Sequence, residues 1–73
     1  MAQLKKQFGR RLQYLRVAAK VTQEQLADKV GVTIESISNI ERGIHGPSFD
    51  TLEKIAAALQ ISVSDLFVFD DAV

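Results

Sequence analysis

Cysteine and tryptophan are absent from this sequence of 73 residues, and proline and histidine occur once each. Without cysteine the chain can form neither a disulfide framework nor a thiolate metal site. His45 is the only imidazole, and one histidine cannot build a metal site alone. We therefore expect no metal and no cofactor.

The residue patterns that accompany catalysis are also missing. The sequence has no glycine-rich loop that could cradle a phosphate, and no serine, histidine and aspartate set with a plausible pocket. A chain of this length has no room for a separate effector domain beside its core. These absences predict a protein that is not an enzyme and takes no small-molecule ligand.

The sequence contains no long apolar run. No stretch approaches the roughly 18–20 apolar residues that a membrane span needs, and no apolar segment of a signal peptide follows the basic start. The hydrophobic fraction of 47% and the charged fraction of 25% are ordinary for a globular protein. We expect one soluble, cytoplasmic domain over residues 1–73, with a core at about 8–68, a tail at 69–73 and no membrane partner.

The formal net charge is zero, from nine basic and nine acidic side chains. Taken alone, this disfavours a nucleic-acid partner, because phosphate contacts supply most of the non-specific affinity for DNA. The charges are unevenly distributed, however. Residues 1–30 carry seven basic and two acidic side chains, or +5, whereas residues 31–73 carry two and seven, or −5. Such a chain can present a basic face to one partner and an acidic face elsewhere.

Apolar residues recur at spacings of three and four, the period of an amphipathic helix. In the first segment they form one stripe: Leu4, Phe8, Leu12, Leu15 and Ala19. Each of the next four segments follows a residue suited to cap a helix: Thr22, Thr33, Ser48 and Ser62. Gly31 and Gly43 follow the second and third segments, where glycine commonly ends a helix. The pattern predicts an all-α fold of five short helices.

Residues 23–42 have the layout of a helix-turn-helix: a short helix, a turn at Gly31, and a capped helix from Ile34 to about Arg42. An ordinary corner between two bundle helices would show the same apolar spacing. The outer face of the second helix favours function, because it lacks the lysines and long charged pairs of a solvated face. Its side chains are short or form hydrogen bonds, which suits contacts with base edges: Thr33, Ile34, Glu35, Ser36, Ser38 and Asn39.

Matching residues along most of the chain carry a resemblance to a known family. They are Arg11-Leu12, Leu15-Arg16, Thr22 to Ala27, Val30 to Val32, Ile37 to Gly43, Pro47 to Leu52, Ile55 to Ser62 and Leu66-Phe67. The sequence strongly resembles the phage-repressor or Cro-type helix-turn-helix family, also called Xre-like, over about residues 8–68. The resemblance implies a compact, five-helix, lambda-repressor-like DNA-binding domain with its helix-turn-helix at the second and third helices.

The resemblance also implies how double-stranded DNA is bound. The third helix would enter the major groove, with five predicted base-contact residues nearest the base edges: Thr33, Ile34, Glu35, Ser36 and Asn39. Contacts with the phosphate backbone would position the domain, and they are assigned to Gln23, Ser38, Arg42, Gly43, His45 and Ser48. In the family the loop after the third helix is often basic, whereas Ile44 and His45 are not. The family further implies a buried ion pair between Arg16 and Glu41, which assigns Arg16 to structure.

The predicted function is a sequence-specific transcription regulator, a repressor or autoregulator that acts as a homodimer. Two copies on half-sites about 10 base pairs apart raise affinity and specificity, because one short helix contacts few base pairs. We expect the dimer contact at the fifth helix and the tail, where Val68 and Phe69 extend an apolar stretch. Alternatively, that stretch folds onto its own core. A second hypothesis is an antitoxin-like or other protein-binding helical module on the same scaffold.

Overall fold

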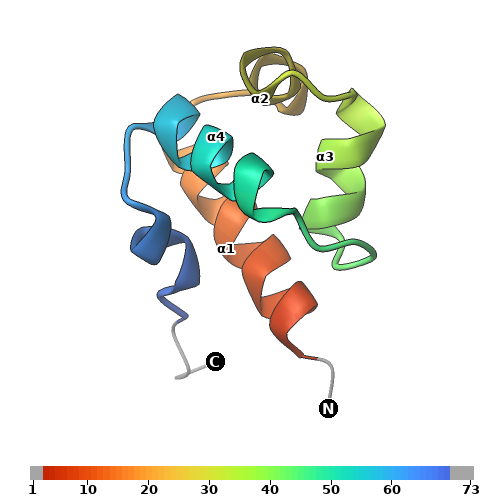
Figure 1. Ribbon diagram of the computed structural model, residues 1–73, viewed down its shortest axis with the longest axis vertical. Coiled ribbons are helices and arrows are strands. Elements are labelled where there is room, and N and C mark those ends of the chain that lie inside the picture. Colours follow the sequence, from red (N-terminus) through yellow and green to blue (C-terminus); the bar gives the residue numbers. More distant parts are fainter. Residues whose placement is uncertain (1–2, 70–73) are drawn as a thin grey trace.

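The computed structural model describes residues 3–69 and is drawn in Figure 1. Over this range the elements are α1 (Leu4–Ala18), α2 (Gln23–Val30), α3 (Ile34–Glu41), α4 (Phe49–Leu59) and η1 (Val63–Phe67), with no strand. The prediction of an all-α fold is confirmed, although the last of the five helices is a short 3-10 helix. None of the helices in residues 3–69 has the length and apolar character needed to cross a membrane.

The four predicted capping residues begin α2, α3, α4 and η1. Each hydroxyl accepts a hydrogen bond from the backbone N–H three residues further on, at Thr22, Thr33, Ser48 and Ser62. Two of the caps are complete capping boxes, because the side chains of Gln25 and Asp65 accept from the N–H groups of Thr22 and Ser62. The starts of these elements are therefore determined by contacts within three residues.

The core is one cluster of side chains contributed by every element. Its buried apolar members are Phe8, Leu12, Leu26, Ala27, Val30, Ile37, Ile40, Leu52, Ile55, Ala56, Leu59 and Leu66. α1 packs against α3 and η1, and α2 packs against α3 and α4, so the helices surround this cluster (Figure 1). Full burial of one large apolar side chain contributes about 1.5–3 kcal/mol, which makes the cluster the main source of stability.

α1 differs from the predicted stripe at both ends. Phe8 and Leu12 are buried, but Leu4 and Ala19 are exposed, and the helix ends at Ala18. The buried face continues instead to Arg16, which lies four residues beyond Leu12 and therefore on the same side of the helix. The predicted stripe was therefore wrong at Leu4 and Ala19, and it missed Arg16, a charged residue that is buried because it pairs with Glu41.

η1 differs from the predicted fifth helix in winding and in what it buries. Only Leu66 is fully buried, whereas Val63 and Phe67 are each 38% exposed. The ring of Phe67 nevertheless contacts that of Phe8, with 5.2 Å between centroids. A five-residue element makes less than two turns, so it presents a single side chain fully to the core.

Candidate nucleic-acid interface

The turn between α2 and α3 depends on Gly31. This residue has a φ of 87°, in the left-handed region, and its N–H and that of Val32 both donate to the carbonyl of Ala27. A Cβ at Gly31 would meet no atom within 4 Å, so glycine is required by the backbone conformation and not by lack of space. Ala27, on α2, is buried in the core cluster.

α3 has a buried face and an accessible face. Ile37 and Ile40 are buried in the core. The predicted base-contact residues are accessible: Thr33, Ile34 and Glu35 are exposed, and Ser36 and Asn39 are half-buried. Ile34 is 46% exposed at the start of the helix, so a large part of its apolar side chain is available for contact with a thymine methyl group.

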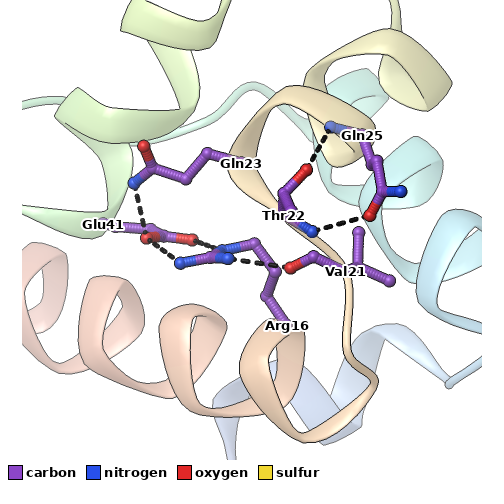
Figure 2. Close-up of polar contacts among 6 residues, drawn as sticks. All are labelled: Arg16, Val21, Thr22, Gln23, Gln25 and Glu41. Atoms are coloured by element: carbon purple, nitrogen blue, oxygen red, sulfur yellow. Dashed lines mark hydrogen bonds and ion pairs between the residues drawn. The ribbon is translucent and has the colours of Figure 1, made fainter.

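A buried ion pair joins α1 to the end of α3 (Figure 2). The Nε of Arg16 donates to Oε2 of Glu41 at 2.6 Å, and its Nη2 donates to Oε1 at 3.2 Å. The remaining terminal nitrogen, Nη1, donates to the carbonyl of Val21 at 2.8 Å. The side chains of Arg16 and Glu41 are 10% and 3% exposed, so both charged groups are largely shielded from solvent, and each has hydrogen-bonding partners. This is the pair that the family resemblance implied.

Gln23 connects this ion pair to the start of α2. Its Nε2 donates to Oε1 of Glu41 at 2.9 Å, as Figure 2 shows. Gln23 is the first residue of α2 and is half-buried, so it lies beside the unpaired N–H groups and the positive dipole end of that helix. The proposed phosphate-contacting residue is thus held in place by a buried carboxylate, which the sequence did not indicate.

α1 and α3 approach closely at Gly9. A Cβ on this residue would lie 2.5 Å from the carbonyl oxygens of both Ile40 and Glu41. Only a glycine lets α1 meet the C-terminal end of α3 at this distance. The absence of a side chain at Gly9 therefore allows the short distance between α1 and the C-terminal end of α3.

The loop after α3 turns at Gly43, which has a φ of 78°. The N–H of Gly43 donates to the carbonyl of Ile40, and those of Ile44 and His45 donate to that of Asn39. Because the N–H groups of Gly43 and His45 make hydrogen bonds within the protein, they are not free to contact a phosphate. Within residues 3–69 no hydrogen bond engages the N–H of Gly46 or of Ser48.

The side chains of the other predicted phosphate-contacting residues lie around this loop. Arg42 and His45 are exposed, and Ser38 is half-buried on α3. The guanidinium of Arg42 lies 3.5 Å from Oδ1 of Asn39, which leaves the amide nitrogen of Asn39 uncommitted. The hydroxyl of Ser48 caps α4 and also donates to the hydroxyl of Thr51.

Arg11 has a role that the sequence did not indicate. Its Nε donates to the carbonyl of Asp65 at 2.9 Å, and its guanidinium lies 5.7 Å from the ring centre of Tyr14. The contact is invisible in the sequence because the two residues lie 54 positions apart.

Known proteins resemble this chain over most of its length. A family described as helix-turn-helix matches residues 12–66. An uncharacterized HTH-type transcriptional regulator of Archaeoglobus fulgidus is 43% identical over 61 residues, which span 84% of this chain and 87% of that protein. The immunity repressor protein of Bacillus phage phi105 is 43% identical over 56 residues, 77% of this chain and 39% of the repressor. The restriction-modification controller protein C.AhdI from Aeromonas hydrophila has a crystal structure with a TM-score of 0.84 and 39% identity, covering 92% of this chain and 100% of that one.

Proposed function

The chain belongs to the helix-turn-helix family, and on this premise we propose that it is a sequence-specific DNA-binding transcription regulator that inserts α3 into the major groove. The observation that carries the proposal is the accessible face of α3. On this face Ile34 is exposed among polar side chains, while Ile37 and Ile40 are buried on the opposite face. The similarity of the chain to a transcriptional regulator and to a phage repressor supports the function of a regulator, and not that of an enzyme.

The predicted base-contact residues would divide the readout by their chemistry. Asn39 has a free amide nitrogen beside its carbonyl oxygen and can bond to N6 and N7 of adenine. Glu35 has no cationic partner within the described residues and can accept from N4 of cytosine. The methyl groups of Thr33 and Ile34 suit the thymine methyl, and the hydroxyl of Ser36 suits either donor or acceptor.

The phosphate contacts would come from the start of α2 and from the end of α3 with the loop that follows it. Gln23 approaches from the N-terminus of α2, where backbone N–H groups and the helix dipole favour an anion. Arg42 and the loop up to Ser48 follow the C-terminal end of α3, where Gln23 also lies through its hydrogen bond to Glu41, and Ser38 lies on α3 itself. These contacts position the domain on the duplex but do not discriminate between sequences.

Replacing the base-contact residues tests the groove docking. Random duplexes are selected for binding and sequenced, which gives the site, its symmetry and its spacing. On the selected site Asn39→Ala should weaken binding by about 1–3 kcal/mol, or roughly 5- to 150-fold, and relax the preference at one base pair. Glu35→Ala should relax it at another. Unchanged affinity and unchanged preference in both variants would exclude the docking of α3.

Gln23→Ala provides the contrasting variant. Because a phosphate contact carries no sequence information, this variant should weaken binding to all duplexes by a similar factor and keep the selected sequence. Loss of preference at a defined base pair would instead place Gln23 against a base. Gel-shift titrations against the selected duplex and a scrambled duplex measure both quantities.

The functional unit is proposed to be a homodimer formed through η1 and the chain that follows it. Val68 is 54% exposed and Phe67 is 38% exposed, and Phe67 packs on Phe69 with 6.2 Å between ring centroids. Phe69 itself is partly buried against the core, as the alternative expected, so the apolar surface that a second copy would cover is formed by Phe67 and Val68. The rest of the predicted tail, residues 70–73, lies outside the described residues.

Analytical ultracentrifugation over a range of concentrations tests the dimer. The wild type should dissociate on dilution, and Val68→Asp should shift the midpoint to higher concentration. Lys54→Asp, an exposed position on α4, serves as the control. A monomer at every concentration of the wild type would exclude the dimer while leaving the groove docking intact. A reporter gene placed behind the selected site then distinguishes repression from activation.

A further inference from the structure

Two lysines at the start of α1 lie against the loop that follows α3. A Cβ at Gly43 would lie 2.8 Å from Cγ and 3.1 Å from Cα of Lys6. A Cβ at Gly46 would lie 3.9 Å from Cγ of Lys5. The first turn of α1 therefore touches the loop directly, although the two segments are far apart in the sequence.

This placement follows from the packing of α1 on α3. Gly9 meets the last carbonyls of α3, and Lys5 and Lys6 lie four and three residues before it, on the same side of α1. One turn nearer the N-terminus, α1 has passed the end of α3 and faces the loop instead. The same close approach that requires Gly9 thus brings the two lysines to residues 43–46.

The charge at this place comes from α1 and not from the loop. Residues 43–48 contain neither lysine nor arginine. Lys5 and Lys6 are both exposed, and within residues 3–69 the single ion pair joins Arg16 to Glu41. The two ammonium groups are therefore not held by any carboxylate of the described chain. Beside Lys5 lies Gly46, whose N–H is engaged by no hydrogen bond within residues 3–69.

We propose that Lys5 and Lys6 contact the DNA phosphates beside the loop after α3, and supply the cations that the loop itself lacks. The inference rests on the proposed function, because it requires α3 to be in the groove and the loop to lie along the backbone. Lysine suits this task, since its ammonium group is a compact charge on a flexible stem and needs no fixed geometry at the phosphate. The contact adds affinity without adding sequence preference.

The salt dependence of binding to the selected duplex tests this contact. Each phosphate neutralised by a cation contributes about 0.9 to the slope of log K against log salt concentration. The double variant Lys5→Gln/Lys6→Gln should therefore have a slope shallower by about 1–2 and keep the selected sequence. Lys29→Gln/Lys54→Gln is the matched control, because it removes the same net charge from exposed positions on α2 and α4. Lys5→Arg/Lys6→Arg should retain the wild-type slope.

The outcomes separate the two proposals. Absence of any selected site for the wild type would exclude the proposed function itself. If the wild type binds its site and Lys5→Gln/Lys6→Gln keeps the same slope, the lysine contact is excluded and the docking of α3 stands. An equal loss of slope in the control pair would also exclude it, since the effect would then be one of net charge. Circular dichroism of each variant checks the fold, and the single variants Lys5→Gln and Lys6→Gln test the contact if the double variant unfolds.

Discussion

The buried ion pair is the residue-scale feature that most constrains substitution. Glu41→Ala leaves the guanidinium of Arg16 buried without a carboxylate, so the free energy of unfolding should fall by about 3–5 kcal/mol. Urea denaturation followed by circular dichroism measures this. Glu53→Ala, at an exposed position on α4, is the control and should change stability by less than about 0.5 kcal/mol. Equal effects from the two variants would contradict a structural role for the pair.

Two glycines are required for different physical reasons, and a pair of substitutions separates them. An alanine in a helix interior normally stabilises by about 1 kcal/mol over glycine, yet Gly9→Ala should destabilise by about 1–3 kcal/mol, because its Cβ meets two carbonyl oxygens at 2.5 Å. Gly31→Ala should cost about 1–2 kcal/mol through its positive φ alone.

Asparagine distinguishes the two causes, because it adopts the left-handed conformation more readily than alanine. Gly31→Asn should therefore recover part of the stability lost in Gly31→Ala, whereas Gly9→Asn should be at least as damaging as Gly9→Ala. Thermal unfolding of the four variants gives the ranking. A stabilising Gly9→Ala would show that α1 and α3 can separate at this point without cost.

At the scale of the elements, features that depend on contacts within a few residues were predictable from the sequence, and features that depend on contacts between distant residues were not. The caps at Thr22, Thr33, Ser48 and Ser62 act within three residues, so the starts of α2, α3, α4 and η1 were predictable. The accessible face of α3 was also predictable, since it is set by the position of its buried isoleucines. What the sequence did not reveal depends on partners distant in the chain: the approach at Gly9, and the lysines beside the loop.

η1 shows how a distant partner affects a short element. The carbonyl of Asp65 accepts from Arg11 as well as from the N–H of Val68, so a side chain of α1 holds the end of η1. Arg11→Ala should lower the free energy of unfolding by no more than about 3 kcal/mol, because a hydrogen bond from a charged group contributes about 1.5–3 kcal/mol. The control is Arg10→Ala, at the exposed neighbouring position. If both variants unfold at the same urea concentration, the contact contributes nothing to stability.

At the scale of the whole molecule, the uneven charge distribution determines how binding should respond to salt. The cations assigned to phosphates in each copy are Arg42, Lys5 and Lys6, so the slope of log K against log salt should be about −3 for each copy bound. A strongly basic binder loses affinity far more steeply. Adding a cation to the loop by Ile44→Lys, at a residue that is 46% exposed, should steepen the slope by about 1 and raise the affinity for unselected duplexes.

Filter-binding titrations of the wild type and Ile44→Lys at several salt concentrations measure both slopes. Ile44→Gln makes the exposed position polar without adding charge, and it should leave the slope unchanged. A wild-type slope as steep as that of a protein with many phosphate-contacting cations would contradict the charge assignment. The neutral sequence thus predicts a regulator that depends on base contacts for a large share of its affinity.

With the proposed phosphate contact at Gln23, the hydrogen bond from Gln23 to Glu41 would make DNA affinity and fold stability interdependent. Any ligand that draws the Gln23 amide toward itself alters a contact of the buried carboxylate, and the effect is reciprocal by thermodynamic necessity. A substitution of Arg16, which no DNA atom would touch, should therefore alter DNA affinity as well as the melting temperature. Variants selected only for tighter DNA binding would include substitutions in the interior of the protein. Variants selected only for stability would differ in their affinity for the DNA site.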